Sequence, residues 1–310
     1  MSSKSVLILS GGGPRGVIQL GALDYMYRIK QLKKYRTIVG TDIGAIIAIL
    51  IACRFSPREI YDSLFSESTI YNIRPNMSLA SLSKGHIYNI ANFISPIEEL
   101  IVKKLGAVPT LQQLHDNSYD VYLATANLTT AELEYLSHEN YPNLRATDAL
   151  KLACSTPFLY DRVHFQGSQY CNASINDNVS ILFPKRYEPE DIESILCVDV
   201  SGVKQYSKEK RVDSFLAQLQ NLIHFNPLVN QQKNRETALE IFEDKLVLIE
   251  FTGLANSNIF STHIEGVECP RMFSYGSSIA ASTIGVEVGD IQQIDTEEQP
   301  QPVFPSEDED

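Results

Sequence analysis

Short apolar runs alternate with segments of helical periodicity along most of the chain. Strands are expected where β-branched and aliphatic residues form runs bounded by glycine or polar residues, at 5–10, 36–39, 120–124, 194–200 and 246–251. Helices are expected at 15–34, 45–53, 57–65, 88–105, 147–154 and 212–224. Strands that alternate with helices predict an α/β fold with a doubly wound, largely parallel sheet.

The segment 45–53 is apolar on every side, so we expect it to be a central, buried helix. The nearly unbroken apolar stretch 43–53 is about half of a membrane span, which predicts no transmembrane segment. The apolar run near the N-terminus is too short for a secretory signal. These features predict a soluble, cytoplasmic protein.

Charge is distributed unevenly over the 310 residues. The formal net charge is −12, and residues 295–310 contain seven acidic side chains and no basic one, which leaves −5 for residues 1–294. The proline, glutamine and acidic residues of 295–310 predict a disordered tail, and residues 1–294 are expected to form one domain. An acidic chain without clustered Lys and Arg argues against a nucleic-acid partner.

Cysteine and histidine spacing indicates neither a disulfide framework nor a metal centre. The five cysteines are scattered, with no CxxC pair, as is typical of a reducing compartment. None of the six histidines (His86, His115, His138, His164, His224 and His263) lies at metal-ligand spacing from another. We therefore expect no metal and no cofactor.

The first candidate site is a glycine-rich turn between the strand at 5–10 and the following helix. It reads Ser-Gly-Gly-Gly-Pro-Arg-Gly from Ser10 to Gly16. Glycines allow a ligand to approach the backbone closely, and successive N–H groups at a helix start bind anions. No Gly-Lys-Ser/Thr follows, so this is not a P-loop. No acidic residue ends the second strand, so the match to a dinucleotide-binding turn is poor.

The second candidate site is the turn from Gly40 to Gly44, between the strand at 36–39 and the buried helix. Two glycines that flank a central residue at a strand-to-helix junction are typical of the nucleophile elbow of hydrolases. The central residue of such an elbow has a strained backbone and little room beside it. A hydrolase carries serine there, whereas this chain carries Asp42.

These two turns, in this order, resemble those of the patatin-like phospholipases. GGGPRG is similar to that family's GGGxRG oxyanion loop, and GTDIGAIIA is similar to its GxSxG elbow. The resemblance continues through 111–182 and a helix around Gly276, so it covers roughly residues 5–290. It implies a three-layer αβα fold with a mainly parallel central sheet, and lipid acyl hydrolysis by a serine–aspartate dyad.

The resemblance assigns a role to each matching residue. Gly11, Gly12 and Gly13 match the oxyanion hole, Arg15 the adjoining arginine, Gly40 and Gly44 the elbow glycines, Asp42 the nucleophile and Asn172 the catalytic aspartate. Both dyad positions therefore differ from the family pattern.

Serine catalysis requires a hydroxyl and a base that takes its proton. The Asp42 carboxylate is a poor nucleophile toward an ester, and Asn172 cannot act as a base. An ionised Asp42 close to the N–H groups of the glycine turn is expected to be stabilised by them. It is also expected either to fill the site where the oxyanion should form or to repel the oxyanion from that site. We expect ester hydrolysis by the family mechanism to be lost, which predicts a pseudoenzyme that binds a lipid, an acyl chain or a protein partner.

Two alternatives remain open from the sequence. In one, Asp42 is a nucleophile or acid in an active lipid hydrolase of altered chemistry, with Asp177 as a substitute base. In the other, the chain is a structural interaction protein whose cleft is closed.

Arg15 either holds an anionic headgroup or pairs with an acidic neighbour. The basic patch 204–211 is a solvated loop or a weak peripheral contact with a membrane surface.

Overall fold

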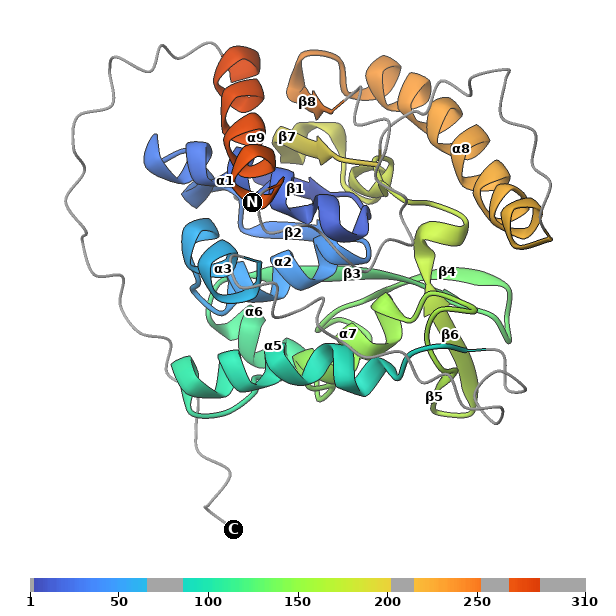
Figure 1. Ribbon diagram of the computed structural model, residues 1–310. Coiled ribbons are helices and arrows are strands. Elements are labelled where there is room, and N and C mark those ends of the chain that lie inside the picture. Colours follow the sequence, from blue (N-terminus) through green and yellow to red (C-terminus); the bar gives the residue numbers. More distant parts are fainter. Residues whose placement is uncertain (1–2, 66–85, 202–214, 252–267, 285–310) are drawn as a thin grey trace.

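The computed structural model describes residues 3–65, 86–201, 215–251 and 268–284 (Figure 1). The predicted tail at 295–310 and the basic patch at 204–211 lie outside these residues. The helices within these ranges include none whose length and apolarity suit a membrane span.

Eight strands of the described residues form one sheet. They are β1 (Lys4–Leu9), β2 (Thr37–Gly40), β3 (Asp120–Asn127), β4 (Glu132–Leu136), β5 (Val163–Phe165), β6 (Ser168–Asn172), β7 (Ile192–Asp199) and β8 (Leu246–Glu250). The strand order is β5-β6-β3-β2-β1-β7-β8, and β4 also pairs with β3. The pairs among β3, β2, β1, β7 and β8 are parallel, whereas β4, β5 and β6 pair antiparallel.

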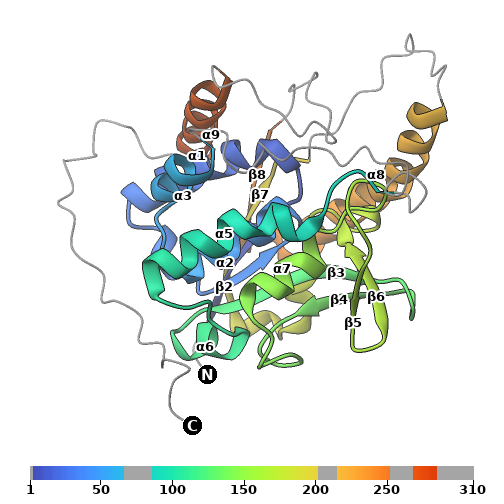
Figure 2. The ribbon, with the colours of Figure 1, turned by 60° about the horizontal axis from the view of Figure 1, so that its bottom comes forward.

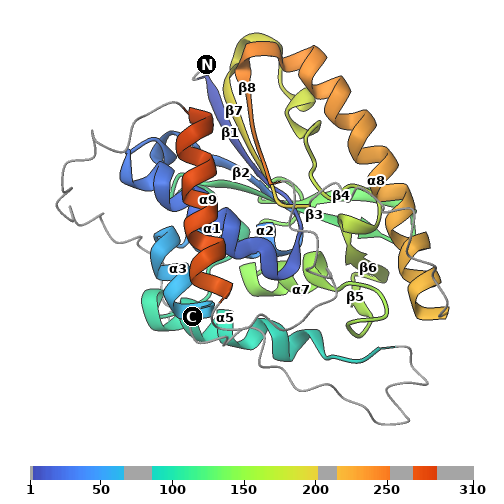
Figure 3. The same cartoon turned by 45° about the horizontal axis from the view of Figure 1, so that its top comes forward.

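Helices cover both faces of this sheet. The α-helices are α1 (Gly16–Arg28), α2 (Ile43–Ala52), α3 (Pro57–Leu64), α5 (Ile90–Leu105), α6 (Leu111–Asp116), α7 (Ala146–Cys154), α8 (Phe215–Phe242) and α9 (Glu268–Ile284). Short 3-10 helices are η1 (Gly13–Arg15), η2 (Leu32–Lys34), η4 (Ala173–Ile175), η5 (Phe183–Arg186), η6 (Pro189–Asp191) and η7 (Glu243–Lys245). Figure 3 shows α1, α2 and α9 on one side of the sheet and α8 on the other, and Figure 2 shows α5 and α7 on the α2 side.

Two hydrophobic cores correspond to the two faces of the sheet. Because side chains alternate along a strand, Leu7 and Leu9 of β1 pack beneath the helices around α1 and α2. Val6 and Ile8 of the same strand belong to the second core, which includes Ala238 of α8. The predicted three-layer α/β architecture with a mainly parallel sheet is therefore confirmed.

The local predictions differ from the structure in several places, and helix α6 was not among the expected helices. The helix expected at 15–34 ends at Arg28, after which Lys30 has a positive φ of 59° and the chain reverses into η2. Helix α8 extends to Phe242, beyond the predicted end at residue 224. The antiparallel strands β4, β5 and β6 were not predicted. They are only three to five residues long, and β4 and β5 are largely half-buried.

Candidate active site

The second glycine turn has the geometry of a nucleophile elbow. Asp42 lies between β2 and α2 with φ 54° and ψ −120°, a region that costs a non-glycine residue about 1–3 kcal/mol. A Cβ atom on Gly40 would lie 2.4 Å from the Gly44 carbonyl oxygen, and one on Gly44 would lie 2.3 Å from the Leu9 carbonyl oxygen. Both glycines are therefore required by close backbone approach, as the sequence predicts for an elbow.

The first glycine turn lies directly beside this elbow. It follows β1, and β1 pairs in parallel with β2, so both turns leave the same edge of the sheet. The Gly11 N–H donates to the Asn178 carbonyl at 2.9 Å, and Asn178 Nδ2 donates to the Gly11 carbonyl at 3.2 Å. These two bonds hold the glycine turn against the loop that follows β6.

The Asp42 carboxylate points into the glycine turn. Its Oδ2 accepts hydrogen bonds from the Gly13 N–H at 3.1 Å and from the Gly12 N–H at 3.4 Å. The side chain is partly buried, and this burial raises the pKa of Asp42 above its ordinary value. Hydrogen bonds to the carboxylate lower the pKa again, but only in part. They come from the N–H groups of Gly13, Ile43 and Gly12 and from the Asn172 side chain. The N–H groups thus stabilise the anion as expected, but desolvation outweighs them.

Asn172 ends β6 and faces the same region. It is 1% exposed, and its backbone N–H donates to the Ser155 carbonyl at 3.0 Å. Its Oδ1 accepts from the Ser174 N–H at 2.8 Å, and its Nδ2 donates to Thr156 Oγ1 at 3.2 Å. The amide is therefore fixed through both of its polar atoms.

Asp177, considered above as a substitute base, holds its own loop through one carboxylate oxygen. Its Oδ1 accepts from the N–H groups of Val179 at 3.3 Å and Ser180 at 2.9 Å, which closes a turn of its own loop. Burial raises its pKa, with the two N–H groups acting in the opposite direction. Through these hydrogen bonds the Asp177 carboxylate stabilises the conformation of its own loop.

Arg15 is buried beside the elbow and has acidic neighbours. It is 5% exposed, and its Nε donates to the Gly12 carbonyl at 3.4 Å. Desolvation lowers its pKa, whereas the negative charges of Asp199 and Asp42 raise it. The two roles considered for Arg15, binding of an anionic headgroup and pairing with an acidic neighbour, both stay predictions.

Asp199 is a member of this region that the sequence reasoning missed. It is the last residue of β7, is 6% exposed, and accepts from Gln231 Nε2 of α8 at 2.8 Å and from the Ser201 N–H at 2.8 Å. A signal was present in the sequence, because an acidic residue at the carboxyl end of a buried parallel strand lies at the edge where sites form.

The structure brings the predicted residues together at one edge of the sheet. Asp42, the Gly11–Gly13 turn, Arg15 and Asn172 are linked by the contacts above. Cys154 adds a further contact, since its Sγ donates to the Asp42 carbonyl at 3.4 Å. Chemically, this arrangement holds a carboxylate at two backbone N–H donors and offers a neutral amide beside it.

Comparison with known proteins places this geometry in a family. The family model described as "Patatin-like phospholipase" matches residues 7–183. A "Probable lipid hydrolase 463L" of Invertebrate iridescent virus 6 is 22% identical over 268 residues, which cover 82% of this chain and 91% of the viral protein. A "cGAMP-activated phospholipase" of Escherichia coli (strain TW11681) is 30% identical over 157 residues, which cover 47% of this chain and 43% of the bacterial protein.

Solved structures show the same fold. VipD from Legionella pneumophila superposes with a TM-score of 0.52 at 14% identity, covering 92% of this chain and 67% of VipD. The fold and the sequence relatives thus define an α/β protein related to lipid hydrolases. The chain belongs to the patatin-like phospholipase family.

Proposed function

We propose that this patatin-like protein no longer hydrolyses lipid esters by a serine–aspartate dyad and acts instead by binding a lipid or its acyl chain. Family membership supports the lipid as ligand class, since the relatives above include a probable lipid hydrolase and a phospholipase. The side chains at the two dyad positions, Asp42 and Asn172, support the loss of catalysis.

One observation carries the proposal. The Asp42 carboxylate accepts hydrogen bonds from the Gly12 and Gly13 N–H groups. In acyl transfer, such N–H groups must be free to bind the oxyanion that develops in the transition state. A resident carboxylate competes for the same donors and, when ionised, repels a second negative charge.

The base position supports the same conclusion. Asn172 uses its Oδ1 to accept from Ser174 and its Nδ2 to donate to Thr156, and a neutral amide takes no proton from a nucleophile. In another hydrolase, removal of the catalytic unit lowers kcat by about 10^6-fold. A loss of that order is expected here.

The test is restoration of the dyad in the full-length protein by Asp42→Ser with Asn172→Asp. Both changes suit their surroundings, because serine is the usual elbow residue and an aspartate in place of Asn172 keeps an acceptor for the Ser174 N–H. We expect no fatty-acid release from phospholipid or p-nitrophenyl esters by the wild type and measurable release by the double variant. The single variants are the matched controls, and each is expected to remain inactive.

Lipid binding is tested separately with phosphatidylcholine vesicles and a free long-chain fatty acid. Saturable binding of either by the wild type is the expected result. If neither binds and the double variant also stays inactive, the lipid site is gone, and the chain is then a structural interaction protein.

A second function is favoured by the raised pKa of Asp42, because burial holds its proton more tightly than in an ordinary aspartate. Such a group can act as an acid in altered hydrolytic chemistry. This function predicts wild-type activity that Asp42→Ala abolishes, or a covalent adduct on Asp42 detected by mass spectrometry. Either result would overturn the proposal of a binding protein.

A further inference from the structure

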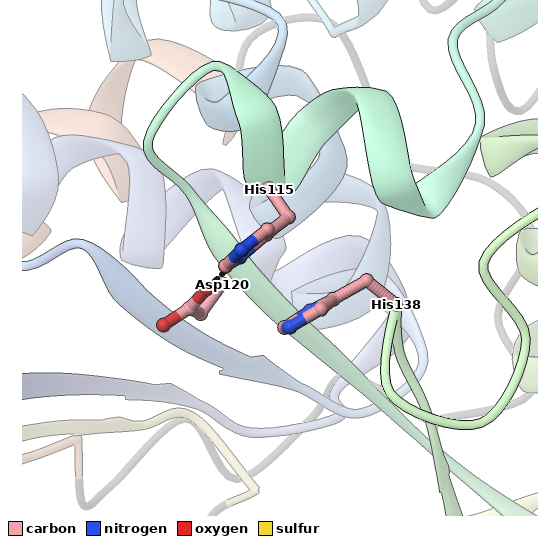
Figure 4. A group of neighbouring side chains, drawn as sticks. All are labelled: His115, Asp120 and His138. Carbon is pink, nitrogen blue, oxygen red and sulfur yellow. Dashed lines mark hydrogen bonds and ion pairs between the residues drawn. The ribbon is translucent and has the colours of Figure 1, made fainter.

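A second polar cluster lies at the opposite edge of the sheet, away from Asp42. It consists of His115, Asp120 and His138 (Figure 4). The Nδ1 atom of His115 is 2.6 Å from Oδ1 of Asp120, and the two imidazole rings stack with centroids 3.8 Å apart and planes 13° apart. One ligand atom from each of the three side chains lies within 4.8 Å of the others.

Three separate elements bring these side chains together. His115 is in the last turn of α6, and Asp120 is the first residue of β3. Strand β4 runs antiparallel to β3 with Leu136 opposite Leu123, so the chain returns His138 to the level of the start of β3. Two histidines that are far apart in sequence thus become ring-stacked neighbours.

The hydrogen bonding of the cluster is incomplete. Nδ1 of His138 is buried and has no partner among the described residues. By contrast, both carboxylate oxygens of Asp120 have partners: Oδ1 contacts His115, and Oδ2 lies 3.4 Å from Lys4 Nζ. A buried ring nitrogen without a partner needs a physical explanation, and an ion that binds it is one such explanation.

The donor set identifies the class of ion. Two imidazoles and one carboxylate suit Zn²⁺ and related first-row divalent ions, with a fourth position left for water. Ca²⁺ and Mg²⁺ prefer sites made of oxygen ligands alone.

We propose that His115, Asp120 and His138 form a binding site for a divalent transition-metal ion, with Zn²⁺ as its representative. The site ties α6, the start of β3 and the turn after β4 to one another. It lies at the amino ends of the parallel strands, whereas Asp42 lies at their carboxyl ends, so it is separate from the candidate active site. The inference is independent of the proposed function.

The geometry requires a modest rearrangement of the cluster, because His115 Nδ1 and Asp120 Oδ1 must move apart from 2.6 Å while ligand atoms up to 4.8 Å apart move closer. Ligands on one tetrahedral Zn²⁺ lie about 3.3 Å apart, given bonds of about 2.0–2.1 Å. The nearly parallel rings must also rotate so that their lone pairs converge on one point. His115 can supply this movement, because its side chain is 43% exposed and it sits at the end of a six-residue helix.

The test is titration of the EDTA-treated, full-length protein with ZnCl₂, followed by calorimetry and by metal analysis after dialysis. We expect one equivalent of Zn²⁺, and a loss of affinity of about tenfold or more in His138→Gln and in Asp120→Asn. His164→Gln is the matched control, since His164 is exposed on β5. Absence of saturable binding by the wild type, or an equal loss in the His164 variant, would overturn the proposal.

Lys4→Met gives a test that misfolding cannot imitate. Its ammonium lies 3.4 Å from Asp120 Oδ2 and opposes a second cation on that carboxylate. Removing it is expected to tighten Zn²⁺ binding by about threefold to tenfold. Unchanged or weaker Zn²⁺ binding in this variant would contradict an ion at Asp120. Titration with MgCl₂ is expected to give no saturable signal, and a Mg²⁺ signal as strong as that of Zn²⁺ would refute the assigned class.

Discussion

The two edges of the parallel sheet carry polar clusters that are built in different ways. At the carboxyl edge, Asp42 and the Gly11–Gly13 turn each come directly after a strand, β2 or β1. At the amino edge, His115, Asp120 and His138 come from a helix end, a strand start and a turn. The first cluster is made by two local motifs, and the second is made by the register between β3 and β4.

This difference determines how tightly each edge constrains its residues. The elbow glycines touch backbone atoms, so there is no room for a side chain at either position. The amino edge is formed by half-buried or exposed side chains that can move. The carboxyl edge should therefore respond strongly to small changes in volume, and the amino edge should respond mainly to changes in its ligands.

The largest expected effect is that of Gly44→Ala at the carboxyl edge. The added Cβ would lie 2.3 Å from the Leu9 carbonyl oxygen and 2.8 Å from that of Ser10, so the backbone of β1 or α2 must shift. We expect the free energy of unfolding to fall by about 3 kcal/mol or more, measured by urea unfolding followed by circular dichroism.

Gly167→Ala is the control for this prediction. Gly167 has a φ of 84° but nothing within 4 Å of the added Cβ, so only backbone strain of about 1 kcal/mol is expected. His138→Gln without metal should cost less than about 1 kcal/mol. If Gly44→Ala costs no more than these two changes, the proposed contrast between the edges is wrong.

The next expected effect concerns the charge at the carboxyl edge. Burial raises the pKa of Asp42 in the folded state, so the folded protein binds more protons than the unfolded chain between the unfolded and the folded pKa. The free energy of unfolding must therefore fall as pH rises through that window. Asp42→Asn removes this contribution, so the stability of the variant relative to the wild type should increase as pH rises from about 4 to about 7.

The measurement is the urea midpoint of both proteins at each pH. Comparison with the wild type is required because Asp24, Asp177 and Glu250 also have raised pKa values, while those of Glu59 and Glu139 are lowered. Glu240→Gln on α8 is the charge control, since it removes an exposed carboxylate. An Asp42→Asn difference that is constant with pH would show that Asp42 is not desolvated by the elbow.

The parallel core and the elbow could be predicted from sequence because their signals are local. The all-apolar segment 45–53 and its preceding Gly40–Gly44 turn indicate a buried helix after a strand, and α2 is buried along its whole length. The direction of the Asp42 side chain could be anticipated only in general terms, because it depends on how β1 and β2 align their turns.

The amino-edge cluster could not be predicted in the same way. No metal is expected from histidine spacing along the chain, because His115 and His138 are far apart in the sequence. Their contact depends on β4 (Glu132–Leu136), a five-residue strand that was not predicted although its polar and apolar residues alternate. Because β4 was not predicted, the proximity of His115 and His138 could not be predicted either.

The smallest expected effect tests how the amino edge holds His115. Thr110 caps α6: its Oγ1 accepts from the Gln113 N–H at 3.2 Å, and Gln113 Oε1 accepts from the Thr110 N–H at 2.8 Å. Thr110→Ala removes the cap and should lower stability by about 1 kcal/mol, whereas Thr110→Ser should retain it. Fraying of α6 would also weaken Zn²⁺ binding by a few-fold, because His115 lies in the last turn of that short helix. Equal Zn²⁺ affinities in the two variants would show that the contact with Asp120, and not the helix, positions His115.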